Sequence, residues 1–123
     1  MFNFIKRFKQ IGGYEPIQTL LLGEFAYEEI RQPSSDGDIK TQKKRQNVSI
    51  LLEFFETNSA HIVVKTYDKE ERFHLLKKPF NFDLFSVEVE NVNSRKRYLF
   101  VKENNICAFL DNSNDSARVF LIN

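Results

Sequence analysis

The chain has 123 residues, the size of a single domain, and its 41% hydrophobic and 28% charged residues are typical of a globular protein and exclude a disordered or fibrous one. Its formal net charge of +1 excludes a general electrostatic attraction to nucleic acid or to an anionic membrane, which would have to come from local patches. Phe supplies most of the aromatic residues, with 13 copies against 4 Tyr and no Trp, so we expect a core of phenyl rings. We expect a single globular domain over residues 1–123.

The first segment predicts a short amphipathic helix. Apolar residues recur at helical spacing within Phe2–Ile11, basic side chains fall on the opposite face, and Gly12-Gly13 ends the pattern as glycine does after a helix. A basic helix of this kind could also lie on a membrane surface. Packing on its own β-domain explains the same pattern and is the interpretation we prefer.

The N-terminus, the apolar runs and the cysteine content bear on where the protein is located. Met1–Phe8 lacks the long apolar stretch and the small-residue cleavage site of a secretory signal. The longest apolar runs, such as Leu20–Leu22 and Tyr98–Val101, fall far short of the ~20 residues that a membrane helix needs, so we expect no membrane span. Cys107 is the single cysteine and cannot form an internal disulfide, and a cytoplasmic location is the simplest expectation.

The next two segments are less clear. Ile17–Ile30 fits either a helix or a long strand, and Gly23 in its middle favours the strand because glycine costs a helix about 1 kcal/mol relative to alanine. Gln32–Gln46 contains a Pro-Ser-Ser-Asp-Gly cluster and then a basic run, so we expect a mobile loop, the longest in the chain.

From Asn47 onwards the pattern predicts short strands. Phe85–Glu90 alternates strictly between apolar and polar residues. Phe80, Phe82 and Leu84 alternate in the opposite phase, which predicts a β-bulge or a sharp bend where the phase changes. The other expected strands are Val48–Phe55, Ile62–Tyr67, Phe73–Leu76, Tyr98–Lys102, Ile106–Leu110 and Val119–Ile122.

Segments rich in Asn and Asp separate these strands and are typical of tight hairpin turns. We therefore expect a mainly β fold, an antiparallel meander that forms a small barrel or a sandwich. The short N-terminal amphipathic helix would cap an open end or cover one face, and with it an α+β description stays open.

No catalytic motif stands out. The sequence has no Gly-rich phosphate loop, no paired-cysteine metal motif and no nucleophile elbow, so we expect no enzyme activity and no cofactor. Cys107 with His61 or His74 as its base is a formal alternative. The thiol lies in an apolar strand pattern, where thiols are usually inert, and both histidines are expected to be exposed, so we expect no catalytic residue.

The sequence evidence for a metal site is equally weak. Two histidines are too few for zinc, which usually takes at least three protein ligands. Asp111–Asp115 resembles the start of a calcium loop, but Ser116 stands where such a loop needs glycine and Ile122 where it needs glutamate. We expect a turn there and no metal site.

Local basic clusters are the remaining candidates. One lies in the expected long loop and one at an expected hairpin, and together they are the candidate partner-binding residues: Lys43, Lys44, Arg45, Arg95, Lys96 and Arg97. Lys77-Lys78, just before Phe80 and Phe82, adds a further basic pair. Charge runs in loops are most often solvated surface, and acidic residues are nearly as numerous in this chain.

The leading hypothesis is a small non-catalytic domain that binds another protein. A specific version is an inhibitor or immunity-type protein that neutralises a toxin by covering its active site. The contact surface would include Gln32–Gln46 and the hairpin around Asn93–Arg97. The alternative is a nucleic-acid-binding accessory domain that uses the basic loops and aromatic side chains. The sequence leaves the oligomeric state open.

Overall fold

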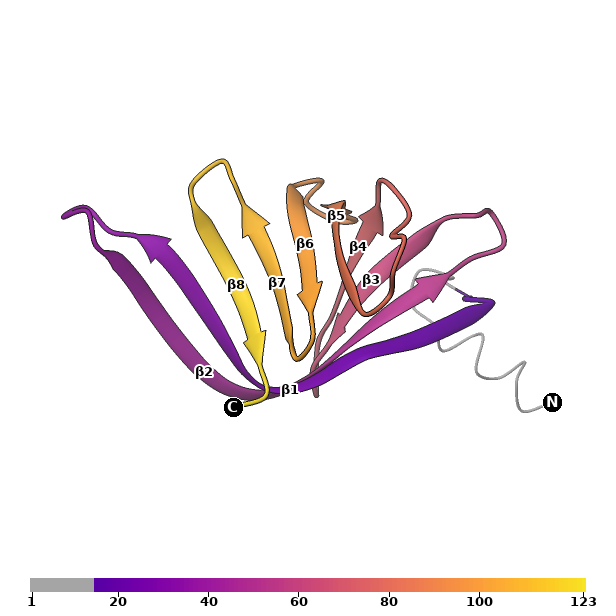
Figure 1. The fold of residues 1–123 in the computed structure, drawn as a ribbon, viewed down its shortest axis with the longest axis horizontal. Coiled ribbons are helices and arrows are strands. Elements are labelled where there is room, and N and C mark those ends of the chain that lie inside the picture. Colours follow the sequence, from indigo (N-terminus) through magenta and orange to yellow (C-terminus); the bar gives the residue numbers. More distant parts are fainter. Residues whose placement is uncertain (1–14) are drawn as a thin grey trace.

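A computed structural model describes residues 15–123, and this part of the chain is built from antiparallel strands with no helix. Each strand pairs with its neighbours in the sequence and the last pairs with the first, which closes a barrel (Figure 1). The strands are β1 (Gln18–Pro33), β2 (Ile39–Phe54), β3 (Ala60–Lys65), β4 (Glu70–Leu75), β5 (Leu84–Asn91), β6 (Arg97–Glu103), β7 (Ile106–Asp111) and β8 (Ser116–Leu121).

The expectation of a mainly β meander is confirmed, and the barrel is the form that it takes. The strand interpretation of Ile17–Ile30 is confirmed as well, since β1 covers most of it. The predicted helix at Phe2–Ile11 lies outside the described residues. Within residues 15–123 we find no helix with the length and apolar character needed to cross a membrane.

The prediction of a long mobile loop at Gln32–Gln46 is wrong. Only a tight turn separates β1 from β2, and Ile39–Arg45 is strand paired with Tyr27–Pro33. Gly37 has a φ of +91° in this turn, a conformation that glycine adopts without strain. We call this paired segment, Tyr27–Arg45, the arm; it projects to the left of the barrel in Figure 1. The polar composition misled the sequence interpretation, because an exposed hairpin needs no apolar face.

Strand β1 bends so that it can pair with two strands at once. Its pairing with β2 shifts register between Leu21 and Gly23 and again between Phe25 and Tyr27, and beyond the second shift it also pairs with β8. A Cβ atom on Gly23 would lie 2.5 Å from the Cζ atom of Phe25, so only glycine leaves room for that ring. Bulges of this kind sharpen the twist of a strand and allow a sheet to close.

The interior is filled by the phenyl rings that the composition predicts. Phe109 is central: its ring centroid lies 4.3 Å from that of Phe73, 5.0 Å from that of Phe100 and 6.1 Å from that of Phe120. All four side chains are fully buried. An eight-strand barrel has an interior just wide enough for side chains, and here large aromatic side chains occupy it.

The phase change near Leu84 has the second of its two expected causes, a bend at Phe82 and Asp83 just before β5. Phe80 and Phe82 lie in the loop between β4 and β5, and Leu84 is the first residue of β5. Phe80 is fully exposed, while the Phe82 ring packs edge-on against Phe54 at 5.9 Å. The change of phase therefore marks the start of a strand and not a bulge within one.

The hairpin turns form where Asn and Asp predict them. Asn58, Asn104 and Asp115 adopt positive φ, as does Arg95. Asp111 accepts hydrogen bonds from the backbone N and the Oγ of Ser113 at 3.1 and 2.6 Å. The turn interpretation of Asp111–Asp115 is thus confirmed.

One end of the aromatic core carries an ion cluster that joins opposite walls of the barrel. Arg118 on β8 donates to Glu71 on β4 through both terminal nitrogens, at 3.0 and 3.1 Å, and to Glu28 on β1 at 2.9 Å. Its guanidinium carbon lies 5.3 Å from the centroid of the Phe120 ring. Glu28 is buried, so this arginine is its charge partner within the barrel.

We predict that Arg118→Ala lowers the free energy of unfolding by about 2–3 kcal/mol, because it leaves the buried Glu28 carboxylate without its partner. Arg31→Ala is the matched control: it removes a pair with Glu29 in which the arginine is 47% exposed, and should cost less than about 0.5 kcal/mol. Urea denaturation measures both. Equal losses in the two variants would contradict the role given to the cluster.

Candidate functional site

The two predicted basic clusters lie at the same end of the barrel. In a meander, alternate turns share an end, so the arm and the turn between β5 and β6 both lie there. Strands β2 and β6 are on opposite sides of the barrel, because four steps separate them in an eight-strand ring. The clusters therefore do not form one continuous patch.

The cluster at the turn between β5 and β6 is largely compensated by two nearby acids. Arg95 and Arg97 both pair with Glu90 at 3.3 Å, and their guanidinium groups lower the pKa of that carboxyl. Lys96 pairs with Asp111 at 2.7 Å, a hydrogen bond that raises the pKa of the lysine and lowers that of the aspartate. Two carboxylates therefore compensate two of these three cations, so the turn offers less uncompensated charge to a partner than the cluster on the arm does.

The cluster on the arm is different. Lys43, Lys44 and Arg45 are exposed, and within residues 15–123 none of them forms an ion pair with a carboxylate. The acids opposite them on β1 are already engaged: Glu29, opposite Lys43, pairs with Arg31, and Glu28, opposite Lys44, pairs with Arg118. Of the two predicted clusters, the one on the arm is therefore the one whose cations have no carboxylate partner within residues 15–123.

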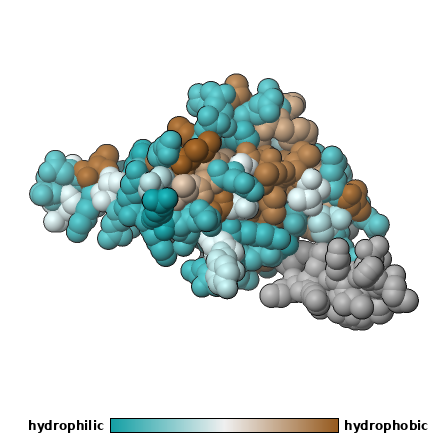
Figure 2. Space-filling view, turned by 90° about the horizontal axis from the view of Figure 1, so that it is seen from below, coloured by the Kyte–Doolittle hydropathy of each residue, from teal (hydrophilic) through white to brown (hydrophobic). Residues whose placement is uncertain are grey.

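Two of these cations lie close to the aromatic ring of Tyr27. Lys43 Nζ lies 4.2 Å from the centroid of the Tyr27 ring, and the guanidinium carbon of Arg45 lies 5.8 Å from it. Both cations are thus within cation–π distance of the same ring. Figure 2 shows the arm as a narrow, mostly hydrophilic projection from the body of the barrel. The sequence interpretation found the basic residues but not Tyr27, which the register of the hairpin places directly opposite Arg45.

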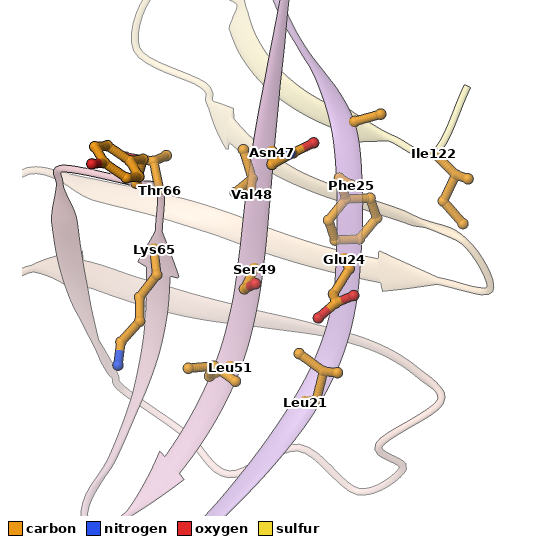
Figure 3. Close-up of a pocket in the computed structure, with 12 residues that line it drawn as sticks. Leu21, Glu24, Phe25, Asn47, Val48, Ser49, Leu51, Lys65, Thr66 and Ile122 are labelled. Atoms are coloured by element: carbon orange, nitrogen blue, oxygen red, sulfur yellow. The ribbon is translucent and has the colours of Figure 1, made fainter.

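A hollow of about 870 Å³ lies at the root of the arm (Figure 3). It forms where β1 bends, between the turn after β3 on one side and the end of the chain on the other. Tyr67 and Leu21 line it and are exposed, whereas Phe25 and Val48 belong to the core. The hollow thus places apolar surface beside the basic strand of the arm.

The two histidines lie side by side on the outer face of the barrel. His61 on β3 and His74 on β4 are register partners with ring centroids 5.8 Å apart. The expectation that both are exposed is wrong for His61, which is 7% exposed. Burial, then the charge of Arg72 and of His74, lowers the pKa of His61 to about 4, and Arg72 Nη1 lies 3.3 Å from its Nδ1. Arg72 itself pairs with Glu53 at 2.8 Å.

Cys107 lies inside the barrel, on the other side of the wall from these histidines. It is fully buried, as the sequence predicts, and burial raises the pKa of its thiol to about 12. The structure therefore does not bring a thiolate and a histidine base together. Among residues 15–123 no group of three or more His, Cys, Asp or Glu side chains could hold a metal ion.

Comparison of the chain with family models, with curated proteins and with solved structures gives no match. The candidate site therefore rests on the geometry of the arm and of the hollow at its root.

We predict that the Cys107 thiol is unreactive in the folded protein, because it is buried and its thiolate is strongly disfavoured. A chromogenic disulfide reagent at pH 8 should label the native protein at least roughly tenfold more slowly than the protein in denaturant. Rapid labelling of the native protein would show that the thiol is accessible and would revive the nucleophile hypothesis.

We predict that acid destabilises the protein through His61. Its folded pKa lies below the unfolded value of 6.5, so the stabilisation is complete above pH 6.5 and falls as the pH drops toward 4. Between pH 7 and pH 5 the free energy of unfolding should fall by about 2 kcal/mol. Urea denaturation at several pH values measures this. The His61→Gln variant should lack most of this slope; an unchanged slope would exclude His61 as the cause.

Proposed function

We propose that this protein is a small non-catalytic domain that binds another protein through the arm. The observation that carries the proposal is the uncompensated positive charge of Lys43, Lys44 and Arg45 on a hairpin that projects from a filled barrel. An inhibitor or immunity-type protein that neutralises a toxin is the specific version that we put forward. Its cytoplasmic location remains a prediction.

The filled barrel and the exposed arm together support this proposal. Phenyl rings occupy the barrel interior, so the surface and not the lumen is the place for a ligand. The arm can reach into a cleft of a partner because it extends past the barrel and is exposed along Ile39–Arg45. Free positive charge would speed encounter with an acidic partner, while apolar side chains at the hollow would hold the complex.

Nucleic-acid binding is the second candidate, and one observation favours it. Phe80 is fully exposed in the loop between β4 and β5, next to Lys77 and Lys78. An exposed ring beside cations can stack on a base while the cations contact phosphate. Lys78 is partly engaged, because its Nζ donates to the side chain of Asn58. This loop lies at the barrel end opposite the arm, so the two candidates use separate surfaces.

The test is a pull-down with the full chain from lysate of its own cell, with and without nuclease. Reversing the charge of the arm in the variant Lys43→Glu/Lys44→Glu/Arg45→Glu should abolish capture of a stoichiometric protein that survives nuclease. With that captured protein purified, the same variant should associate about tenfold more slowly at low salt, with an unchanged Tm.

The matched control carries the same change of charge elsewhere, at three exposed lysines: Lys69→Glu/Lys77→Glu/Lys78→Glu. It should capture the protein as the unmodified chain does. If the control and not the arm variant loses its partner, or if the captured material disappears with nuclease, the arm proposal fails and the loop around Phe80 takes its place.

A further inference from the structure

The arm has one unpaired strand edge. Strand β2 pairs with β3 only from Ser49 onwards, whereas Ile39–Arg45 pairs with β1 alone. From Tyr27 to Arg31, β1 is covered on its other side by β8, so it is β2 that presents the long free edge. A closed barrel otherwise removes sheet edges, and this one remains because β2 continues past the end of β3.

The register fixes which backbone groups face outward. Ser34 N donates to Asp38 O at 2.8 Å, so these two residues form a hydrogen-bonded pair. Pairs alternate along an antiparallel ladder, so those at Lys40, Gln42 and Lys44 bond to β1. The backbone N–H and C=O groups that point away from β1 are those of Ile39, Thr41, Lys43 and Arg45.

The charge along this edge selects the occupant. Ile39–Arg45 has the sequence IKTQKKR, with four basic side chains and no acidic one. Lys40 and Lys44 lie on one face of the ribbon, and Lys43 and Arg45 on the other, as strand alternation requires. A strand added beside β2 would meet cations on both of its faces, and opposite charges on neighbouring strands attract.

The same charge disfavours a second copy of the chain at this edge. Two copies paired antiparallel through β2 would set the basic run of one opposite the basic run of the other. Like charges directly opposite each other destabilise a strand pair. Lysines on an edge strand also prevent unwanted pairing, so they discriminate between an acidic partner and a copy of the protein itself.

From these observations we infer that the free edge of β2 binds an extended, acidic segment of a partner protein, which adds to the sheet as a further strand. The inference rests on the protein-binding function proposed above and specifies its mode. The turn after β3 stops the added strand near Asn47, where the hollow with Leu21 and Tyr67 receives an apolar side chain at the end of the segment.

The test uses a synthetic probe and a backbone variant. The probe is a capped, fluorescent peptide of roughly seven residues that alternates glutamate with valine and threonine, the length of Ile39–Arg45. Thr41→Pro removes one outward N–H and blocks the edge with its ring, yet keeps the β1 pairing and every charge. Thr41→Val, which keeps the N–H, is the control. Fluorescence anisotropy at low salt measures binding, and circular dichroism and Tm verify folding.

We expect the peptide to bind the unmodified chain and Thr41→Val alike, and Thr41→Pro at least about tenfold more weakly. A peptide with lysine in place of glutamate should not bind. Equal binding by Thr41→Pro, with loss of binding in the arm charge-reversal variant, would overturn strand addition while leaving the proposed function intact. The inference would also be overturned if the acidic peptide did not bind, or if a single-stranded oligonucleotide bound in preference to it. The pull-down tests the proposed function separately.

Discussion

Barrel closure requires β1 to pair with β2 along its length and with β8 along its second half, and the rest of the structure depends on how β1 meets this requirement. It bends at two register shifts, and Gly23 makes the first bend fit by leaving room for the Phe25 ring. Because β2 follows β1 beyond the bend while β3 ends at Lys65, the distal half of β2 is left without a second neighbour. The projecting arm and its free edge are thus consequences of the way the barrel closes.

The barrel behind the arm is packed with side chains. Phe109 and its neighbouring rings fill the interior, and the Arg118 cluster ties β8 to β4 and to β1 above them. Glu28 belongs both to this cluster and to the arm, where it lies opposite Lys44. By holding Glu28, Arg118 leaves the lysine uncompensated, so the ion cluster that stabilises the barrel also sets the charge of the arm.

Much of the fold follows from sequence patterns, because burial on one face imposes the alternation seen in Phe85–Glu90 and because Asn and Asp mark the tight turns. The sequence did not predict the arm: Ile39–Arg45 is exposed on both faces, so it lacks any apolar pattern and resembles a loop. Sequence did identify the basic residues. Only the register separates the free cations of the arm from Arg95, Lys96 and Arg97, whose acids are close in space. His61 was misjudged because outer-face burial depends on tertiary contacts.

Residue-resolved amide hydrogen exchange by NMR tests the central claim, that the edge of β2 is open and receives a strand, most directly. In the free protein the amides of Thr41 and Lys43 should exchange fast, while those of Gln42 and Lys44, which bond to β1, should be protected. Adding the acidic peptide should slow exchange at Thr41 and Lys43 and leave Gln42 and Lys44 as they were. Uniformly fast exchange along Ile39–Arg45, or peptide binding that leaves Thr41 and Lys43 unprotected, would contradict it.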